Sequence, residues 1–463
     1  MANALDIPRI VVAATGSGVG KTTATVALMG ALKARGLKVA PFKCGPDYLD
    51  PTYHQRAAGV RSHNLDGWMM QRDGVLATFA HASRGADIAV IEGMMGLFDS
   101  ATPTSDEGST AEIAKWFDAP VLLVNDASGI ARTISAIAAG FARFDPAVRL
   151  AGLICNRVGS RGHLDLLRAA QPEVPIVGGF PEQSALAFPE RHLGLLMADE
   201  AAVPQSRIDG WSRLAAEWLD LDAILALARS APPLDLNDVS PRASQSSTRT
   251  KCRIGIAYDD AFHFYYDDNL NRLRAFGAEL VTFSPSRDRT LPDVDGLYFG
   301  GGYPEALARE LSSNTQMLDA IRKFAARGGV VYAECGGLMY LSEGIRTLDG
   351  TTWPMASLIP GVTVMSDRLQ ALGYAEITTR CDSILGPAGT SFRGHQFRYS
   401  TLQPGHDEND IERIYEVKPR WGAAFIEGYR HGNVLASYVH AHWASNPRVA
   451  EAIVRSCEQS RAR

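Results

Sequence analysis

A glycine-rich stretch near the start of the chain, ATGSGVGKTT at residues 14–23, has residue types that suit phosphate binding. Glycines let backbone N–H groups approach phosphate oxygens, Lys21 can meet the outer phosphates, and the Thr22 hydroxyl can ligate Mg²⁺. The usual pattern, G-x-x-x-x-G-K-[ST], has glycine where this chain has Thr15. A turn without a ligand is the alternative, but the Gly-Lys-Thr-Thr run favours a nucleotide. The residues expected to bind ATP are Gly16, Ser17, Gly18, Val19, Gly20, Lys21, Thr22 and Thr23.

Charged residues follow in KCGPDYLDP at 43–51, where Asp47 and Asp50 come shortly after an apolar run. Hard carboxylate oxygens near a phosphate loop are the ligands that Mg²⁺ recruits, and the metal offsets charge as a γ-phosphoryl group moves. Lys43, in the same segment, is expected to bind the nucleotide. The alternative for the two aspartates is capping of a helix that begins near Pro51.

Two further expected strands end in polar residues. Glu92 ends the apolar run in VIEGMMGLFD at 90–99, and Asn156 ends LAGLICN at 150–156. Ligands of parallel α/β sheets collect at the carboxyl ends of the strands, so Glu92 is expected to be a metal ligand. The Asn156 amide can read the edge of adenine, although an asparagine that forms a turn fits the sequence equally well.

A cysteine in the second half of the chain has the surroundings of a nucleophile. The segment GVVYAECGGLMYL at 329–341 reads as a strand, a cysteine, two glycines and a helix, which is the layout of a nucleophile elbow. The N-terminus of the following helix favours the thiolate form of Cys335, and the thiolate is the attacking species. The other five cysteines lack C-x-x-C spacing, which disfavours a zinc site or a disulfide framework. We expect them to be inert.

A nucleophile of this kind needs an oxyanion site and a general base. The glycine loop in GLYFGGGYPE at 296–305 can present backbone N–H groups to an oxyanion or to bound glutamine. The segment YVHAHW at 438–443 offers His440 and His442 as bases. The glycines expected to act are Gly300, Gly301 and Gly302.

Short apolar runs that alternate with helical stretches would position these residues. They are apolar on both faces, as strands of a buried parallel sheet are. We therefore predict an α/β protein with two doubly wound domains at 1–229 and 252–463, joined by a linker at 230–251 that is rich in Pro, Ser and charge. The expected strands are 9–14, 38–42, 87–93, 120–125 and 150–156 in the first domain, and 253–259, 280–285, 296–302 and 329–335 in the second.

Length, charge and hydropathy limit the class of protein. A chain of 463 residues is too long for one core of typical size. The net charge of −5 disfavours nucleic acid as a partner. No apolar run reaches the ~18 residues that a membrane span needs, and the N-terminus does not resemble a secretion signal. The protein is expected to be cytoplasmic.

The motifs resemble those of two known groups of enzymes. The N-terminal loop resembles that of dethiobiotin synthetase, and FGGGYPE, AECGGLMYL and SYVH resemble class I glutamine amidotransferases, which have a flavodoxin-like fold. This second resemblance implies that Cys335 is the nucleophile and His440 the base. The usual third member, a Glu two residues after the base, is replaced here by His442, as in the branch of amidotransferases that act on corrinoid carboxylates. The orienting group therefore stays unassigned, and His442 is better explained as a structural residue.

Over essentially its whole length the chain resembles the cobyrinic acid a,c-diamide synthase family. The resemblance implies ATP- and glutamine-dependent amidation of the a and c carboxylates of hydrogenobyrinate or cobyrinate in cobalamin biosynthesis, through acyl phosphates and ammonia. It implies that ATP and Mg²⁺ bind in the first domain and L-glutamine in the second. Asp47, Asp50 and Glu92 would serve metal and substrate, and His395, in FRGHQFRYS at 392–400, is either structural or faces the substrate.

Two alternatives remain at this point. The first is a ligase that amidates another tetrapyrrole, such as a cobyric acid synthase or a nickel-sirohydrochlorin amidase, which would share these motifs. The second is a partitioning-type ATPase whose second domain is a binding module. The expected partners are a corrin polycarboxylate and L-glutamine, with a homodimer as one option for assembly and without nucleic acid or membrane.

Overall fold

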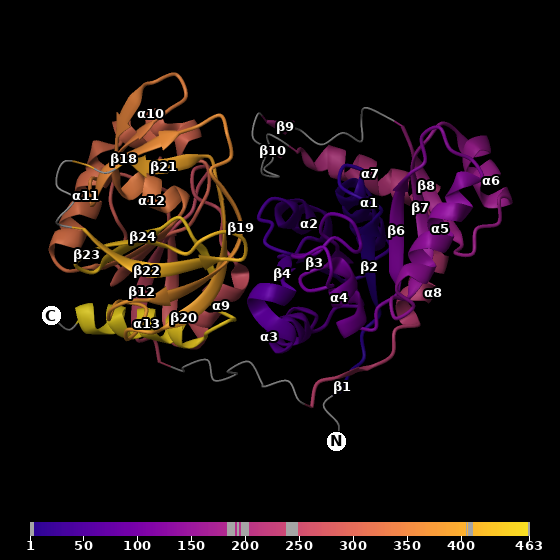
Figure 1. The fold of residues 1–463 in the computed structure, drawn as a ribbon, viewed down its shortest axis with the longest axis horizontal. Helices are drawn as coiled ribbons and strands as arrows, with labels where there is room; N and C mark the ends of the chain where they lie inside the picture. The colour runs from indigo at the N-terminus through magenta and orange to yellow at the C-terminus, as the bar shows by residue number, and fades with distance from the viewer. Residues whose placement is uncertain are drawn as a thin grey trace. The chain divides into compact units, whose positions relative to one another are not determined.

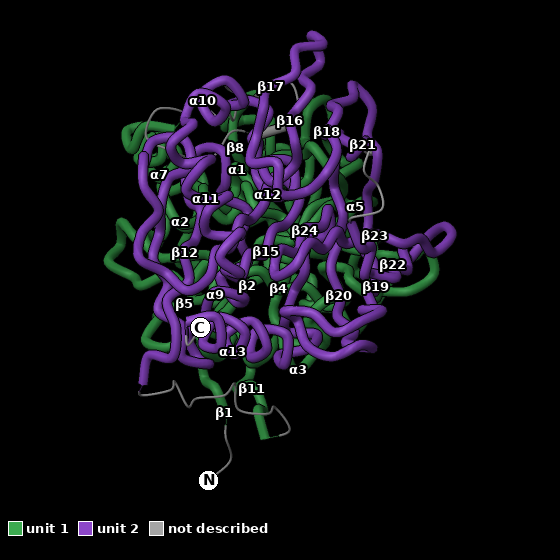
Figure 2. Tube along the Cα trace, turned by 90° about the vertical axis from the view of Figure 1, so that its left-hand side faces the viewer, with its two compact units in different colours: residues 1–242 green, residues 243–463 purple. Residues whose placement is uncertain are grey.

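The chain forms two compact units, residues 1–242 and 243–463, each with its own central sheet (Figures 1 and 2). The computed structural model describes residues 4–182, 190–191, 194–195, 203–237, 249–403, 405 and 411–461. Half of the expected linker, residues 238–248, lies outside the described residues. Its first part is described, and there β11 (Leu234–Asp235) pairs with β1 (Ala4–Leu5) in the first unit.

The first unit is built on a parallel sheet whose strand order in the described residues is β4-β3-β5-β2-β6-β7-β8. Most of its strands are buried on both faces, which explains why their sequences read as continuous apolar runs. The strands β3, β5, β2 and β6 are parallel neighbours in that order. The loops after β2, β3 and β5 therefore meet at one edge of the sheet. The strands are β2 (Arg9–Ala14), β3 (Val39–Cys44), β4 (His63–Leu65), β5 (Ile88–Glu92), β6 (Val121–Asp126), β7 (Leu150–Val158) and β8 (Ile176–Pro181), with a separate pair β9 (Glu190–Arg191) and β10 (Gly194–Leu195).

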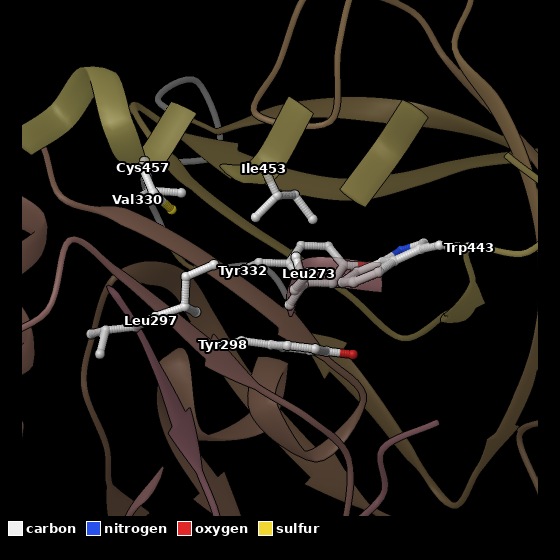
Figure 3. Close-up of a pocket in the computed structure, with 9 residues that line it drawn as sticks. Leu273, Leu297, Tyr298, Val330, Tyr332, Trp443, Ile453 and Cys457 are labelled. Carbon is white, nitrogen blue, oxygen red and sulfur yellow. The ribbon is translucent and has the colours of Figure 1, made fainter. Parts of the chain in front are cut away.

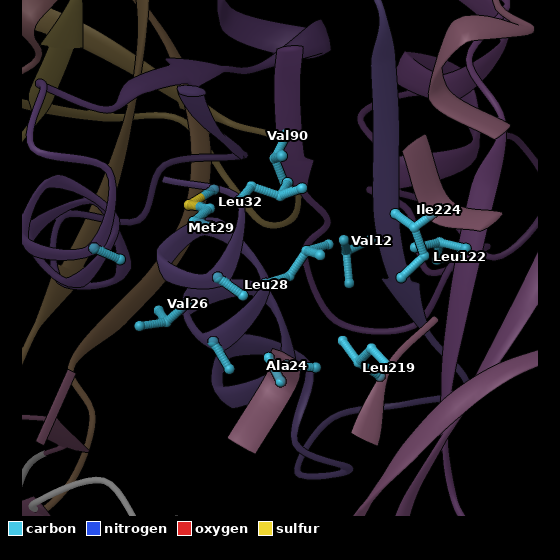
Figure 4. Close-up of a cluster of buried hydrophobic side chains, with 14 of the residues drawn as sticks. Val12, Ala24, Val26, Leu28, Met29, Leu32, Val90, Leu122, Leu219 and Ile224 are labelled. Carbon is cyan, nitrogen blue, oxygen red and sulfur yellow. The ribbon is translucent and has the colours of Figure 1, made fainter. Parts of the chain in front are cut away.

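Helices cover both faces of this sheet. On one face α1 packs against the centre of the sheet, and Figure 4 shows Leu28 and Leu32 among the buried side chains with Val12 and Val90. On the other face the ring of Phe79 lies 4.9 Å from that of Phe42 in β3. The helices are α1 (Lys21–Ala34), α2 (Asp50–Ala58), α3 (Gly67–Ala82), α4 (Thr110–Trp116), α5 (Thr133–Phe144), α6 (Arg161–Ala169), α7 (Gln205–Trp218) and α8 (Leu221–Arg229).

The second unit has a mixed sheet, in the order β13-β12-β14-β15-β24-β23-β22-β19-β20-β25 among the described residues. Its first five strands are parallel, as the sequence predicts for an α/β domain, and the rest are antiparallel, which the sequence did not predict. The strands are β12 (Cys252–Ala257), β13 (Ala278–Phe283), β14 (Gly296–Phe299), β15 (Val330–Glu334), β19 (Ala371–Thr379), β20 (Ser391–Arg398), β22 (Glu412–Pro419), β23 (Phe425–His431), β24 (Val434–Ser437) and β25 (His440–His442).

The antiparallel half of this sheet curls back toward its parallel half. β24 lies beside β15, in the middle of the strand order, whereas β25 lies at the end, beside β20. Only Tyr438 and Val439 separate the two strands in sequence, so β25 cannot lie more than about 11 Å from the end of β24. The curl therefore brings β25 close to the strand that precedes the candidate nucleophile.

The remaining elements of the second unit surround this sheet. A smaller sheet has the order β17-β16-β18-β21. In the described ranges no helix is both long and apolar enough to cross a membrane. These elements are β16 (Ser342–Arg346), β17 (Thr352–Pro354), β18 (Ile359–Met365), β21 (Ser400–Gln403), α9 (Asp267–Ala275), the 3-10 helix η2 (Pro304–Leu307), α10 (Ala308–Ser313), α11 (Thr315–Ala326), α12 (Gly336–Leu341) and α13 (Arg448–Arg461).

Candidate functional site

The glycine-rich loop connects β2 to α1 at the centre of the first sheet. Gly18 and Gly20 have φ angles of 76° and 92°, a left-handed conformation that glycine adopts without strain. α1 begins at Lys21, so the N–H groups of its first turn face the loop. The Lys21 ammonium donates to the carbonyl of Met95, 3.2 Å away, in the loop after β5. The segment predicted to bind ATP therefore has the strand, loop and helix arrangement of a phosphate site.

A cluster of opposite charges lies beside this loop. The Thr22 hydroxyl donates to Glu92 Oε1 at 2.7 Å and lies 3.4 Å from Asp50 Oδ2. Lys43 Nζ lies 2.5 Å from Asp50 Oδ2 and 2.9 Å from Glu92 Oε1. Asp50, Lys43 and Glu92 are all buried. The structure thus brings together four of the residues that the sequence singled out, from three different loops and strand ends.

The protonation of this cluster is set by burial and by its charges. Burial alone would raise the pKa of Glu92, but Lys43 and the other positive neighbours outweigh it and hold that pKa well below its usual range. Burial also opposes the charge of Lys43, yet Asp50 and Glu92 raise its pKa. For Asp50, burial and the charge of Asp47 raise the pKa. A cation bound beside Asp50 would lower that pKa again, because it favours the charged carboxylate.

His54 joins the cluster, and the sequence analysis missed it. It is fully buried in α2, where Nε2 lies 2.5 Å from Glu92 Oε2 and Nδ1 lies 3.1 Å from Ser62 Oγ. The second oxygen of Glu92 is therefore held in place by a ring that is itself held. A sequence signal did exist, because His54 follows Asp50 by four residues and so lies on the same face of a helix.

Asp47, expected to bind the metal, and Asn156, expected to bind the nucleotide, make contacts with the protein backbone instead. Asp47 Oδ1 accepts the N–H groups of Leu49 and Asp50, at 2.8 and 2.9 Å, so this oxygen caps the start of α2. It therefore takes the capping role that the sequence allowed, and Asp50 takes the place beside Thr22. The Asn156 amide donates to the carbonyl of Val19 in the glycine-rich loop, at 2.8 Å. That contact braces the loop and uses one of the two amide N–H groups, so the reading of adenine by Asn156 stays a prediction.

The donors present suit Mg²⁺ with a nucleotide rather than Mg²⁺ alone. Over the part of the chain that the structure describes, no group of three or more His, Cys, Asp and Glu side chains is arranged to hold a metal. Thr22, Asp50 and Glu92 supply a hydroxyl and two carboxylates, which are hard oxygen donors. Mg²⁺ in nucleotide sites is held by one or two carboxylates together with phosphate oxygens. The residues present therefore fit the metal.

In the second unit Cys335 lies at the turn between β15 and α12. Its backbone, with φ 47° and ψ −103°, is strained in the way that a nucleophile elbow requires. The backbone is held, because the Cys335 N–H donates to the carbonyl of Ser437 at 2.7 Å. Glycine is needed on the helical side, since a Cβ on Gly337 would collide with the carbonyl of Phe299. The sequence expectation of an elbow agrees with this geometry.

His440 reaches the same place from β25. It lies three residues after Ser437, which holds the Cys335 backbone. A Cβ on Gly301 would collide with His440 Cε1, and a Cβ on Gly336 would lie 3.0 Å from the nitrogen of Gly302. The glycine loop therefore contacts both the base strand and the elbow. The structure brings the expected nucleophile, base and oxyanion loop to one site.

Of the three glycines expected to stabilise an oxyanion, the structure leaves the N–H of one available. The N–H of Gly300 donates to the Tyr265 hydroxyl at 2.8 Å, and that of Gly301 donates to the carbonyl of Phe264 at 3.3 Å. Within the described residues no hydrogen bond occupies the N–H of Gly302. Gly302 is therefore the better candidate donor, and the other two glycines shape the loop.

The protonation of Cys335 differs from the sequence expectation. The helix N-terminus was expected to favour the thiolate, but burial raises the pKa of the Cys335 thiol to about 12, and the charge of Glu305 acts in the same direction. α12 is only six residues long, and its dipole does not offset this burial. Burial also lowers the pKa of His440 to about 3. The resting pair is a thiol and a neutral imidazole, so the base must take the thiol proton during attack.

Glu334, directly before Cys335, ties the nucleophile to the base strand. Its carboxylate accepts the hydroxyls of Tyr332 and Tyr298, at 2.9 and 3.0 Å, and the N–H of Ala441 at 3.1 Å. Burial raises the pKa of Glu334 to about 7. Because Ala441 follows the base, Glu334 fixes the backbone that carries it. The sequence analysis did not identify this residue.

The edge of β25 that does not pair with β20 is hydrogen-bonded by side chains instead of another strand. The Asn269 amide donates to the carbonyl of Ala441 at 2.7 Å and accepts the N–H of Trp443 at 2.8 Å. Figure 3 shows the Trp443 ring near Tyr298 and Tyr332, where together they line a small apolar cavity. The base strand is thus fixed on one edge by β20 and on the other by α9 and the elbow strand.

His395, which the sequence left as structural or facing the substrate, packs on the base. Its ring lies 4.9 Å from that of His440 with an interplanar angle of 16°, and its Nδ1 lies 3.0 Å from the Tyr266 hydroxyl. Burial, together with the charges of His440 and His442, holds the pKa of His395 well below its usual range. Its position is that of a neutral residue that orients the His440 ring.

The neutral state of His395 predicts a pH-dependent contribution to stability. Its pKa in the folded protein lies below the unfolded value of about 6.5, so the unfolded chain takes up the proton first. The contribution is complete above pH ~6.5 and decreases as the pH falls, by about 1.4 kcal/mol per pH unit. We expect His395→Gln to gain about 2 kcal/mol relative to the unmodified protein between pH 6.5 and 5, measured by urea unfolding of both proteins. An equal difference at both pH values would contradict a buried neutral ring.

Comparison with known proteins covers both units. Residues 10–195 match the family model described as CobQ/CobB/MinD/ParA nucleotide binding domain, and residues 253–448 match that of the CobB/CobQ-like glutamine amidotransferase domain. A cobyrinate a,c-diamide synthase from Leptospira interrogans is 52% identical over 98% of this chain and 99% of its own. Proteins with the same name from Syntrophotalea carbinolica and Priestia megaterium are 46% and 41% identical, each over 98% of this chain and over 99% and 98% of their own.

Proposed function

The chain belongs to the cobyrinate a,c-diamide synthase family, and on that premise we propose how its two sites divide the reaction. It is a ligase that performs glutamine-dependent amidation in cobalamin biosynthesis, with a nucleotide-binding domain and a glutamine amidotransferase domain. Enzymatic function of the second domain removes the partitioning-type alternative. The residues and intermediates assigned below are our proposal.

The second unit releases ammonia from glutamine. His440 takes the thiol proton as the sulfur of Cys335 attacks the side-chain amide carbon, and the Gly302 N–H stabilises the oxyanion. His440 returns the proton to the leaving nitrogen, so ammonia departs and a thioester remains on Cys335. Water then hydrolyses the thioester to glutamate and free thiol. The position of neutral His440 against Gly301, in the loop that contacts the elbow, supports this order.

The first unit activates the corrin carboxylate. The glycine-rich loop and Lys21 bind the phosphates of ATP, and Lys43 stabilises the charge that develops at the γ-phosphate. Thr22, Asp50 and Glu92 would hold Mg²⁺, which supplies Lewis-acid stabilisation of phosphate charge when bound. In this step a corrin carboxylate takes the γ-phosphoryl group of ATP, which releases ADP and gives an acyl phosphate. Ammonia then attacks the acyl phosphate to give the amide and inorganic phosphate. We propose hydrogenobyrinate or cobyrinate as the substrate, amidated at its a and c carboxylates.

The observation that carries this proposal is the presence, in one chain, of the Thr22 hydroxyl beside the buried Asp50, Glu92 and Lys43 at a phosphate loop, and of a cysteine elbow with a neutral histidine. Incubation with ATP, Mg²⁺, glutamine and a panel of corrin and nickel-containing tetrapyrrole acids, read by mass spectrometry, tests it. We expect successive mass decrements for two amides on cobyrinate or hydrogenobyrinate, and none without ATP. Amidation of a different tetrapyrrole alone, or of none with either glutamine or ammonium, would refute the proposed substrate.

A further inference from the structure

An exposed apolar surface lies at one end of four adjacent strands in the antiparallel half of the second sheet. These strands follow one another in the order β23-β22-β19-β20 (Figure 2). Because neighbours are antiparallel, the end of β20, the start of β19, the end of β22 and the start of β23 lie together. The exposed apolar residues at these strand ends, called here the apolar end of the sheet, are Leu369, Leu372, Phe397, Trp421, Phe425 and Ile426. A contiguous exposed apolar patch marks a binding surface.

The apolar end is connected across its strands. Leu372 lies directly opposite Phe397 in the register of β19 and β20. The loop after β22 is joined to β19, because the Arg420 N–H donates to the carbonyl of Tyr374 at 2.9 Å. Leu372 and Trp421, which lie two residues or fewer from that hydrogen bond, are 71% and 69% exposed. The surface is therefore continuous and open to a ligand.

The same face of the sheet carries the proposed base. Successive side chains of a strand point to opposite faces, and Ala375 is part of the core, so Leu372, three residues earlier, points away from the core. Phe397 shares this face with His395, two residues earlier in β20. His440 lies opposite His395 in β25, and their rings are stacked. Since two residues of a strand span about 7 Å, the apolar end begins close to the base that would release ammonia.

Positive charges surround the apolar end. The charged residues of the segments 366–373, 396–400 and 416–426 are Arg368, Arg398, Lys418, Arg420, Asp367 and Glu416. Four of these six are positive and two are negative, which leaves an excess of two positive charges. Glu416 is already engaged, because it lies 3.3 Å from Lys418. An apolar surface with surplus cations fits a ligand that has an apolar body and several carboxylates.

We propose that the apolar end binds the corrin macrocycle, whose apolar face lies on Leu372, Phe397 and Trp421 while its carboxylates face the surrounding cations. This inference rests on the proposed function and adds to it a corrin-binding surface in the second unit. A corrin polycarboxylate combines a broad apolar ring system with carboxylates around its edge, which matches the surface. A symmetric contact with a second copy of the chain would instead bring the same cations together.

Two substitutions at Leu372 test the apolar and the charged contact at one position. Leu372→Asp and Leu372→Lys remove the same apolar area, but only the aspartate repels carboxylates. Equilibrium dialysis of cobyrinate, and in parallel of hydrogenobyrinate, against the full chain measures binding through the visible absorption of the corrin. We expect Leu372→Asp to raise the Kd about 5- to 20-fold and Leu372→Lys to raise it less. Urea unfolding checks that each variant is folded.

Two further substitutions separate these contacts by their salt dependence. Arg368→Gln should raise the Kd about 2- to 5-fold at low salt and leave it unchanged at ~0.5 M NaCl, because exposed charges are screened. Trp421→Ser should raise it about 5- to 20-fold at both salt concentrations, because apolar contacts are not screened.

The matched control is Leu348→Asp. Leu348 is 64% exposed and lies in the turn between β16 and β17, in the smaller sheet of the same unit. Its substitution introduces the same charge at an equally exposed leucine and should leave corrin binding and amidation unchanged. An equal rise of the Kd in this variant would mean that any added negative charge weakens binding, which would overturn the proposal.

Other occupants of the apolar end give different results. An unchanged Kd in Leu372→Asp and Trp421→Ser would overturn the proposal. If light scattering then showed a lower mass for these variants than for the unmodified protein, the occupant would be a second copy. If amidation with ammonium lost kcat at an unchanged Kd, the surface would have a structural role.

Failure of this inference is distinguishable from failure of the proposed function. The unmodified protein, assayed with the panel of tetrapyrrole acids, reports on the substrate alone. If it amidates cobyrinate or hydrogenobyrinate while the variants keep its Kd, only the corrin-binding surface is wrong. If it neither binds nor amidates these two corrins, the proposed substrate and the surface assigned to it are both refuted.

Discussion

Replacing Cys335 by alanine should abolish glutamine-dependent amidation and leave ammonium-dependent amidation close to the rate of the unmodified protein. The variant removes the only atom that forms the thioester, and neither His440 nor Gly302 can replace it. We expect a loss of at least ~10³-fold in glutaminase kcat, as for other covalent nucleophiles. Amide formation measured with each nitrogen donor in turn checks both halves of the prediction.

The matched control is Cys381→Ala. Cys381 is a free and partly exposed thiol in the same unit, away from the elbow. Its replacement should leave both activities intact. Retained glutaminase activity in the Cys335 variant would refute the role of this residue. Loss of ammonium-dependent amidation as well would mean that the thiol also takes part in activating the corrin carboxylate.

Replacing Glu92 by glutamine should lower ATP-dependent amidation and leave glutaminase activity intact, which is the opposite of the effect expected for Cys335→Ala. Glu92 contacts Thr22, Lys43 and His54 at once, and the substitution removes its charge while it keeps its size. One metal ligand is weakened, and Lys43 loses one of its two ion-pair partners. We expect ATP-dependent amidation to fall by about 10²- to 10³-fold with either nitrogen donor, the range seen when one preorganised electrostatic group is removed.

Glutaminase activity without the corrin substrate should persist in the Glu92 variant, and it is the internal measure that the second unit is folded. Glu173→Gln serves as the matched control, because its carboxylate is exposed and pairs with Arg143 at the surface. Unchanged amidation in Glu92→Gln would exclude this carboxylate from the metal site. A loss of amidation that occurs only with glutamine as nitrogen donor would mean that the substitution acts on the second unit, which would contradict the proposed role of Glu92.

The sequence predicted the parallel strands well because both of their faces are buried. The run RIVVAA is β2 without a change of boundary, and the elbow segment contains β15. The three residues of β4 are too few to form a pattern. The antiparallel strands were not predicted, because β19 and β22 mix exposed and buried residues irregularly instead of forming continuous buried runs.

The candidate site shows the same contrast between features that a local sequence pattern predicts and features that depend on distant contacts. Residues in short motifs, such as Thr22, Glu92 and Cys335, could be proposed from the sequence because local spacing determines their position. Glu334 was not, since its partner Ala441 is distant in sequence and the contact exists only after the sheet has curled. The protonation of Cys335 was misjudged because burial, which motifs do not report, outweighs the helix dipole.

The curl of the second sheet also determines when the candidate site around Cys335 can assemble during synthesis on the ribosome. The nucleophile strand emerges well before β24 and β25, which lie much later in the chain. Until β24 and β25 have left the exit tunnel, Cys335 lacks both the carbonyl that holds its backbone and the imidazole proposed to take its proton. A chain that ends before β24 and β25 would therefore lack the proposed base, and we expect it not to hydrolyse glutamine.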